Sequence, residues 1–270
     1  MRKILIFFPL LMLFLFSCGG NRDQAIKPPS TNEEAIQTYQ DALNGLKSGD
    51  YFYASKKFSE AEGMLSDIDS AAKAALMSSY CLYNINSYDE AILNLRRFIR
   101  IYPASTYVSY AHYLIAISYY EQILDEDKDM QPLINSKKQI EDFIEKFPNT
   151  DYAIDLRFKL DLVINQLAAK ELSIARYYIK TEKWIAAINR LQFVVENYDK
   201  TIFVEEALHR LVEIYYKIGL VEEAKVAAAL LGYNYNSGEW YEKSYKILNT
   251  NYKSPIIKKD NEKDSLIRRT

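Results

Sequence analysis

The sequence predicts an all-α fold of paired helices, and three observations support this prediction. With 8 Gly and 7 Pro, these two residue types make up 15 of 270 residues, about 6%, where soluble proteins average roughly 12%. Because turns depend on these residues, little room is left for a sandwich or a barrel. Asp151 to Lys180 contains neither Gly nor Pro. An aromatic-x-x-Ala pattern also recurs at a regular spacing along the chain.

The composition narrows the class of partner. The chain has 34 Lys+Arg against 36 Asp+Glu and a formal net charge of −2. A nucleic-acid-binding protein would be expected to carry a clear basic excess, so we expect no nucleic-acid partner. Aromatic residues reach 14%, and 23 of them are tyrosines, which predicts a soluble helical body packed with aromatic rings.

The amino terminus has the layout of a secretory signal. Arg2 and Lys3 precede an apolar run, Ile4–Phe16, of 13 residues, whereas a membrane-spanning helix needs about 20. No Ala-x-Ala-like cleavage site follows. Leu15-Phe16-Ser17-Cys18 instead resembles the lipobox of bacterial lipoproteins, which implies lipid modification at Cys18. An apolar helix retained as a membrane anchor is the alternative.

These features predict four segments. Residues 1–17 are a lipoprotein signal peptide, 18–32 a lipidated flexible tether, 33–252 the helical body, and 253–270 a disordered basic tail with six basic and three acidic residues. By resemblance to bacterial lipoproteins, the absence of Asp after Cys18 implies the outer membrane. The second cysteine, Cys81, is then left without a disulfide partner, and we expect it to be a small buried hydrophobe.

The recurring pattern sets a register for the helical pairs. It occurs at Tyr51–Ala54, Tyr88–Ala91, Trp184–Ala187 and, more weakly, Val221–Ala224, and both the first two and the last two alanines are 37 residues apart. This resembles the tetratricopeptide repeat of 34 residues, in which the small residue lets the two helices of a pair approach closely. We therefore predict a tetratricopeptide-repeat superhelix of about five helical pairs. A bundle of unrelated helices is the alternative.

Prolines and capping residues place the boundaries. Pro103 and Pro148 each follow an aromatic residue at a helix end. Ser105 or Thr106 and Asn149 to Asp151 offer oxygen atoms that can cap the next helix. From Asp151 to Lys180 we predict one long helix, with a loop at Asp125–Pro132. The predicted pairs span residues 34–64, 71–102, 106–147, 151–198 and 201–230.

The sequence contains no recognisable catalytic constellation. His112 and His209 are far apart, no Cys/His cluster has metal-binding spacing, and no glycine-rich phosphate loop occurs. The acidic run Asp125–Asp129 resembles a calcium loop, but Met130 and Ser136 stand where an EF-hand requires Gly and Glu. We therefore expect neither catalysis, nor a cofactor, nor a metal site.

A tyrosine-lined concave surface is the main functional feature that the sequence predicts. The first helices of stacked pairs line such a surface, and tyrosine grips an extended peptide with apolar area and a hydroxyl at low entropic cost. Alternatively, many of these side chains merely pack between helices. The candidate peptide-binding residues are Tyr39, Leu43, Leu76, Tyr80, Tyr83, Asn84, Tyr110, Tyr113, Ile117 and Tyr120.

Five segments in the second half carry a family resemblance. Glu171–Tyr178, Trp184–Arg190 and Val195–Tyr198 resemble the fourth-repeat signature of the BamD family of outer-membrane assembly lipoproteins. Gly232–Ser237 and Trp240-Tyr241 resemble its C-terminal segment, with Asn236 where proline is usual.

The resemblance implies a non-catalytic scaffold, lipid-anchored at the periplasmic face of the outer membrane. It implies two partners: a POTRA domain of the barrel insertase BamA, and unfolded outer-membrane β-barrel proteins. Arg190 lies in the stretch that resembles the fourth repeat, and the resemblance implies that this region contacts BamA. The alternative is that Arg190 forms an ion pair within the chain, with Glu182 or Glu196. A rival reading is a pilotin or adaptor for a secretin or another envelope complex.

Overall fold

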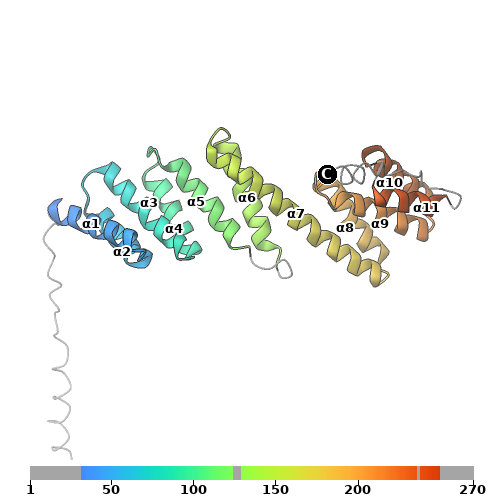
Figure 1. Cartoon of the computed structure of the whole chain (residues 1–270), viewed down its shortest axis with the longest axis horizontal. Helices are drawn as coiled ribbons and strands as arrows, with labels where there is room; N and C mark the ends of the chain where they lie inside the picture. Colours follow the sequence, from blue (N-terminus) through green and yellow to red (C-terminus); the bar gives the residue numbers. More distant parts are fainter. Residues whose placement is uncertain (1–31, 124–128, 236–237, 250–270) are drawn as a thin grey trace, which may run out of the picture.

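The computed structural model describes residues 32–123, 129–235 and 238–249, and in these residues every regular secondary-structure element is a helix (Figure 1). The signal peptide, Cys18 and its tether, the segment Asp125–Lys128 and the basic tail lie outside the described residues. The helices are α1 (Asn32–Ser48), α2 (Tyr51–Met64), α3 (Ile68–Asn84), α4 (Tyr88–Ile101), α5 (Val108–Glu121), α6 (Gln131–Lys146), α7 (Asp151–Lys180), α8 (Trp184–Asn197), α9 (Val204–Lys217), α10 (Val221–Asn234) and α11 (Glu239–Leu248).

The helices form an elongated array in which each packs against the next (Figure 1). Among the first helices of the pairs, α5 also contacts both α3 and α7. This arrangement confirms the predicted tetratricopeptide-type superhelix and its five pairs. One further helix, α11, was not predicted, and it packs on α9 and α10.

The alanine register is confirmed at all four positions. Ala54, Ala91, Ala187 and Ala224 are each 0% exposed, and each lies three residues after the first residue of the second helix in its pair. Full burial at this position fits a close contact between the two helices of a pair. In the first pair the approach also requires Gly45, because a Cβ atom there would lie 2.8 Å from Cδ1 of Tyr53.

In four of the five pairs, the same type of turn joins the two helices. Its key residue has a left-handed backbone and stands two positions before the second helix: Gly49 (φ 80°), Asn86 (φ 61°), Glu182 (φ 57°) and Gly219 (φ 87°). In each turn, the amide of the following residue donates to the carbonyl five residues earlier, as Lys183 does to Tyr178 at 2.9 Å. This is the Schellman pattern, which satisfies carbonyls at a helix end. The third pair lacks this turn and has a longer connection.

Several other predicted boundaries differ by a few residues. The α3 helix begins at Ile68 rather than residue 71, α9 begins at Val204 rather than residue 201, and α10 continues to Asn234 rather than ending at residue 230. The α6 helix begins at Gln131, inside the predicted loop.

The long helix spans Asp151–Lys180 as predicted, and its N-cap Thr150 accepts a hydrogen bond from the amide of Ala153 at 3.3 Å. Ahead of α5, however, the N-cap is Tyr107, and it makes no side-chain capping bond. The Ser105 hydroxyl accepts from the Tyr107 amide instead, so α5 begins at Val108, two residues later than predicted.

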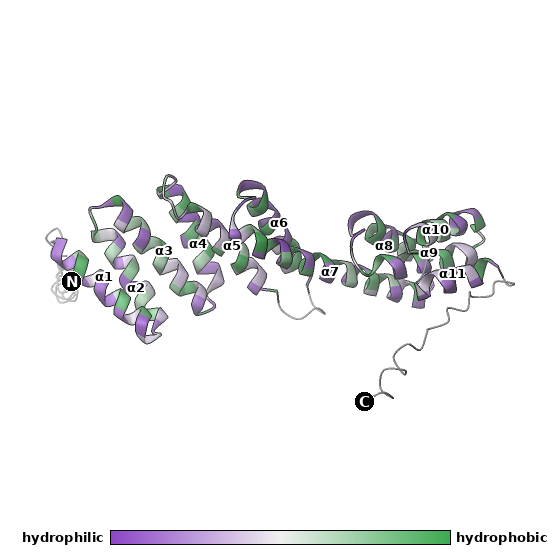
Figure 2. Ribbon diagram, turned by 45° about the horizontal axis from the view of Figure 1, so that its top comes forward, coloured by the Kyte–Doolittle hydropathy of each residue, from purple (hydrophilic) through white to green (hydrophobic). Residues whose placement is uncertain are grey.

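Each helix buries only part of its circumference, and Figure 2 shows polar and apolar residues on the same helices. Phe58, Phe98 and Phe143 are among the largest fully buried side chains and centre the core of the first three pairs. Cys81 is fully buried as predicted, and burial raises the pKa of its thiol to about 12. None of the helices described is both long and apolar enough to cross a membrane.

Candidate functional site: a tyrosine cluster and a charged network

The predicted peptide-binding residues lie on α1, α3 and α5 but not in one environment. Tyr39 and Leu43 belong to the core cluster of the first pair, where the Tyr39 ring meets Phe58 edge-on at 5.3 Å. Tyr39 also lines a pocket of about 250 Å³ together with Ile36, Leu65, Ser70 and Lys73. The first pair therefore offers a separate, mainly apolar hollow.

A second group, which we call the tyrosine cluster, consists of Tyr80, Tyr83, Tyr110, Tyr113 and Tyr152, from the inner helices α3, α5 and α7. The Tyr113 and Tyr152 rings stack with centroids 4.7 Å apart, and Tyr110 lies 5.5 Å from Tyr152 and 6.0 Å from Tyr113. All five side chains are half-buried. The cluster is thus both a packing element and a partly accessible surface.

Burial raises the pKa of three tyrosine hydroxyls of the cluster, those of Tyr83, Tyr110 and Tyr113. Burial, followed by the nearby Tyr80, Tyr152 and Tyr83, raises the pKa of Tyr110 to about 12. Burial also raises the pKa of Tyr113, whose hydroxyl donates to Oδ2 of Asp155 at 3.0 Å. The cluster can therefore present hydroxyl groups that both donate and accept hydrogen bonds.

Other predicted residues take different roles. Leu76 and Ile117 are each 4% exposed and belong to the core between helices, so they support the surface rather than line it. Asn84 donates to the Tyr80 carbonyl of its own helix at 2.8 Å. The Tyr120 ring lies 5.6 Å below the Lys159 ammonium.

Sequence reasoning missed Tyr152. The sequence pattern predicts only that Tyr152 lies in the long helix, whereas the first turn of α7 brings its ring against α5. The signal that could have found it is the Thr150 cap, which fixes where α7 starts and hence which residues face the preceding pair.

Arg190, the predicted partner contact, makes an intrachain ion pair. Its Nη1 lies 2.9 Å and 3.2 Å from the two carboxylate oxygens of Glu171 on α7. The alternatives considered from the sequence, Glu182 and Glu196, are therefore wrong as partners. The Glu171 side chain is only 5% exposed, whereas that of Arg190 is 44% exposed. Arg190 thus neutralises a buried carboxylate and still reaches the surface.

A charged network continues from α7 into α9. Arg176 forms a bidentate pair with Glu206, and Arg210 bridges Glu206 and Glu213, with 2.7 Å to the latter. Although burial opposes it, hydrogen bonds from His209 and Arg210 lower the pKa of Glu213 to about 2. We define Arg176, Glu206, His209, Arg210 and Glu213 as the charged network.

The network ends at the helix that the sequence did not predict. His209 is 3% exposed, and its Nδ1 lies 2.8 Å from the Ser244 hydroxyl on α11. Its ring also packs on Trp240 at 5.0 Å. Gly232 on α10 allows this docking, because a Cβ atom there would lie 2.7 Å from the Tyr241 ring. The C-terminal segment that resembles the BamD family therefore includes Gly232, Trp240 and Tyr241, which bring α11 against α9 and α10.

Ser244, His209 and Glu213 lie in the order of a hydrolytic triad, but the geometry does not suit catalysis. Ser244 is 0% exposed, and its hydroxyl donates to the Trp240 carbonyl at 2.9 Å, so a substrate cannot reach it. His112, the other histidine, packs on Phe147 at 5.3 Å. Within the described residues, no three His, Cys, Asp or Glu side chains are grouped to hold a metal ion.

Comparison with known proteins identifies close relatives. Outer membrane protein assembly factor BamD from Caulobacter vibrioides is 38% identical, and the match covers 91% of this chain and 81% of that protein. The BamD of Rickettsia prowazekii is also 38% identical, over 91% of this chain and 96% of its own length. Among solved structures, the TPR2AB domain of yeast Sti1 is similar with a TM-score of 0.45 and 12% identity, covering 82% of this chain and 83% of that one.

Residues 31–230 match the YfiO family, described as outer membrane lipoprotein. This range contains all five helical pairs except the last residues of α10, and it includes both the tyrosine cluster and the charged network. On these matches, the chain belongs to the BamD (YfiO) family of outer membrane lipoproteins.

Proposed function

We propose that this protein is a non-catalytic scaffold in the assembly of outer-membrane β-barrel proteins. It is anchored by lipid at Cys18 to the periplasmic face of the outer membrane, and it holds unfolded barrel proteins and a POTRA domain of BamA together. The names of the relatives, outer membrane protein assembly factor BamD, support this role.

The tyrosine cluster is the observation that carries the client-binding part of the proposal. An unfolded barrel segment is extended and rich in aromatic side chains, and half-buried tyrosine rings offer it stacking area together with hydroxyl groups. The rings of the cluster come from three successive inner helices, α3, α5 and α7, so a bound segment would run across several repeats.

Site-specific crosslinking tests the client-binding surface. A photoreactive phenylalanine analogue placed at Tyr80 should crosslink to an unfolded barrel protein. The same analogue at Tyr233, which is 88% exposed on α10, provides the matched control outside the cluster. Equal crosslinking at both positions would remove the cluster from the proposal.

The BamA contact at Arg190 needs a test that separates binding from folding. Because Arg190 neutralises the buried Glu171, reversing its charge alone would disturb both. Exchanging the two residues, Glu171→Arg with Arg190→Glu, restores the ion pair while changing the charge shown to a partner. Under the proposal, the exchanged variant melts close to the parent yet recovers less BamA from crosslinked cells. Full recovery of BamA would reject Arg190 as a contact.

The anchor and the assembly role have their own tests. Changing Cys18 to Ala should leave precursor or release soluble protein, since several acyl chains give the stable anchoring that one chain does not. Depletion of the protein should lower many outer-membrane barrels together. Loss of one secretin alone would instead support the alternative that this protein is a pilotin for secretin assembly.

A further inference from the structure

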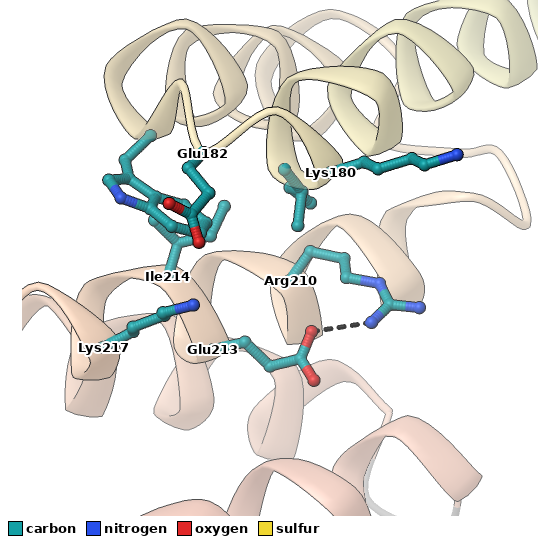
Figure 3. A pocket seen from close by; sticks show the side chains of 8 residues that line it. Lys180, Glu182, Arg210, Glu213, Ile214 and Lys217 are labelled. Atoms are coloured by element: carbon teal, nitrogen blue, oxygen red, sulfur yellow. Dashed lines mark hydrogen bonds and ion pairs between the residues drawn. The ribbon is translucent and has the colours of Figure 1, made fainter.

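Two pockets of the molecule differ in how their charged side chains are paired. The larger pocket, of about 350 Å³, lies between the end of α7 and α9, and its Arg210 and Glu213 are bound to each other at 2.7 Å, as the dashed line in Figure 3 shows. A pocket of about 180 Å³, which we call the three-helix pocket, lies between α4, α5 and α6. No ion pair joins the described side chains that line this second pocket.

Three nitrogen-bearing side chains, one from each helix, line the three-helix pocket. They are Arg96 on α4, His112 on α5 and Lys146 on α6. Arg96 is held by a neutral group, because its Nη2 donates to the Tyr119 hydroxyl at 3.1 Å, and this bond leaves its charge in place. His112 is half-buried, and its ring packs on Phe147 at 5.3 Å. An anion in the pocket would therefore meet hydrogen-bond donors from three helices.

The rest of the lining indicates what kind of anion fits. Ile99, Ile115 and Phe143 form the apolar part, and Phe143 is 1% exposed. The carboxylate of Asp142 accepts hydrogen bonds and repels a bare anion, whereas the amide of Gln139 both donates and accepts. An anion that carries hydroxyl groups can donate to Asp142. The volume lies below the roughly 300–1,000 Å³ of pockets for drug-sized ligands, so the ligand is small.

We propose that the three-helix pocket binds the phosphate group of a small polyol phosphate ester, such as a glycerol phosphate. The phosphate oxygens accept from Arg96, His112 and Lys146, and a hydroxyl of the polyol donates to Asp142. A tetrahedral phosphate directs its oxygens to several sides, which suits donors from three helices, whereas a carboxylate has two oxygens in one plane. The inference rests on this pocket and does not depend on the proposed role in barrel assembly.

His112 itself can report binding. The chain contains 2 histidines, and the other, His209, is 3% exposed in the charged network. Burial, followed by the nearby Lys146, lowers the pKa of His112 below its ordinary value, and Arg96 and Asp142 are the other charged groups of the lining. A bound phosphate ester favours the imidazolium and should raise this pKa. NMR of the imidazole groups in the full chain in detergent measures it, and the His209 signal should not respond.

Three soluble probes test the ligand class. Glycerophosphoglycerol carries a phosphate diester and hydroxyl groups, dimethyl phosphate carries the diester alone, and acetate is a carboxylate. We expect saturable shifts of the His112 signal that are strongest with glycerophosphoglycerol and that weaken at high salt. If acetate or dimethyl phosphate binds as tightly as glycerophosphoglycerol, or if no probe shifts the signal in any of the preparations, the proposal is overturned.

The ester can be the head group of a membrane phospholipid or a soluble molecule, since both present the same chemistry. Full chain placed in phosphatidylcholine discs, with and without phosphatidylglycerol, distinguishes the two sources. A higher His112 pKa in the discs that contain phosphatidylglycerol assigns the pocket to the lipid head group. A response to soluble glycerophosphoglycerol without any effect of the discs assigns it to a soluble ester.

Charge-removing variants locate the site. Arg96→Met and Lys146→Met remove exposed charges, and each should weaken the binding of glycerophosphoglycerol about three- to tenfold, as expected for a partly exposed charged contact. Arg100→Met on α4 and Lys138→Met on α6 are the matched controls, because both side chains are exposed and lie outside the lining. If one pocket variant fails to fold, the other decides. Parent affinity in the folded pocket variants, or equal weakening in the controls, overturns the proposal.

Discussion

The two halves of the molecule hold their helices together in different ways. In the first half, α1 to α6, neighbouring helices meet mainly through aromatic rings and small residues, with Phe58, Phe98 and Phe143 at the centre. One ion pair with a buried carboxylate, Arg97–Glu62, joins α4 to α2. In the second half, α7 to α11, more ion pairs take part: Glu171–Arg190 joins the two helices of the fourth pair, and the charged network joins α7 to α9 of the next pair. The same repeat register thus supports an aromatic half and an ionic half.

This difference affects how far the side chains of each half can move without loss of stability. Apolar contacts are non-directional, so rings can shift slightly when a ligand enters. Buried charges are costly unless each partner stays in place, so the second half is fixed by pairs that cannot slide.

The largest expected effect tests the ionic half. Arg190→Glu would place a second carboxylate against Glu171, whose side chain is 5% exposed. We expect the free energy of unfolding to fall by about 2–4 kcal/mol, since removing one partner of a buried pair costs several kcal/mol and the exposure of Arg190 moderates the loss. Denaturant unfolding measures this.

The control is Arg96→Glu in the aromatic half, where the exposed guanidinium donates only to the Tyr119 hydroxyl. A small change is expected there. Equal losses in both variants would show that the two halves do not differ as described.

The next prediction compares the halves at the same repeat position. Ala91 and Ala187 are both 0% exposed where paired helices touch. Replacing either by Leu inserts three heavy atoms into this contact, which typically costs ~1–3 kcal/mol through overpacking. We expect both melting temperatures to fall. Unchanged melting in both variants would contradict the register.

The sequence predicted the register because it depends on neighbours along the chain. The aromatic-x-x-Ala pattern, the prolines and the uninterrupted stretch from Asp151 to Lys180 are local features that place helix ends and buried faces. The pairs that depend on three-dimensional approach were not predictable in this way. Glu171 lies 19 residues from Arg190, and His209 lies 35 residues from Ser244, so no helical spacing connects them.

The candidate site shows the same limit. Tyr80, Tyr110 and Tyr113 were expected on the inner helices, and the structure brings them together with Tyr152. A period of 3.6 residues cannot distinguish an inner helix face that is open from one covered by the next pair. Leu76 and Ile117 were therefore assigned to the surface, although both are core residues.

Acid stability should differ between the halves because of Glu213. Its pKa is lowered from about 4.3 to about 2 in the folded protein. A carboxyl group whose folded pKa is depressed stabilises the fold above its unfolded pKa, and this contribution is lost as pH falls toward the folded value. We expect Glu213→Gln to lower the melting temperature at neutral pH and to reduce its pH dependence between about pH 4.5 and 2. Glu222→Gln, at an 80% exposed side chain, is the control, and an equal effect there would contradict the assignment.

The smallest expected effect has the opposite sign and concerns the shared turn. Glu182 adopts φ 57° where Gly49 and Gly219 stand in the equivalent turns. A left-handed backbone costs roughly 1–2 kcal/mol for a residue with a Cβ atom, whereas Gly adopts it freely but loses more entropy on folding. Glu182→Gly should therefore stabilise the protein by about 0.5–1 kcal/mol. Asn86→Gly should gain less, because Asn visits this region readily, and Gly219→Ala should destabilise. Denaturant midpoints give the order, and a loss of stability in Glu182→Gly would show that the Glu182 side chain contributes more than its backbone costs.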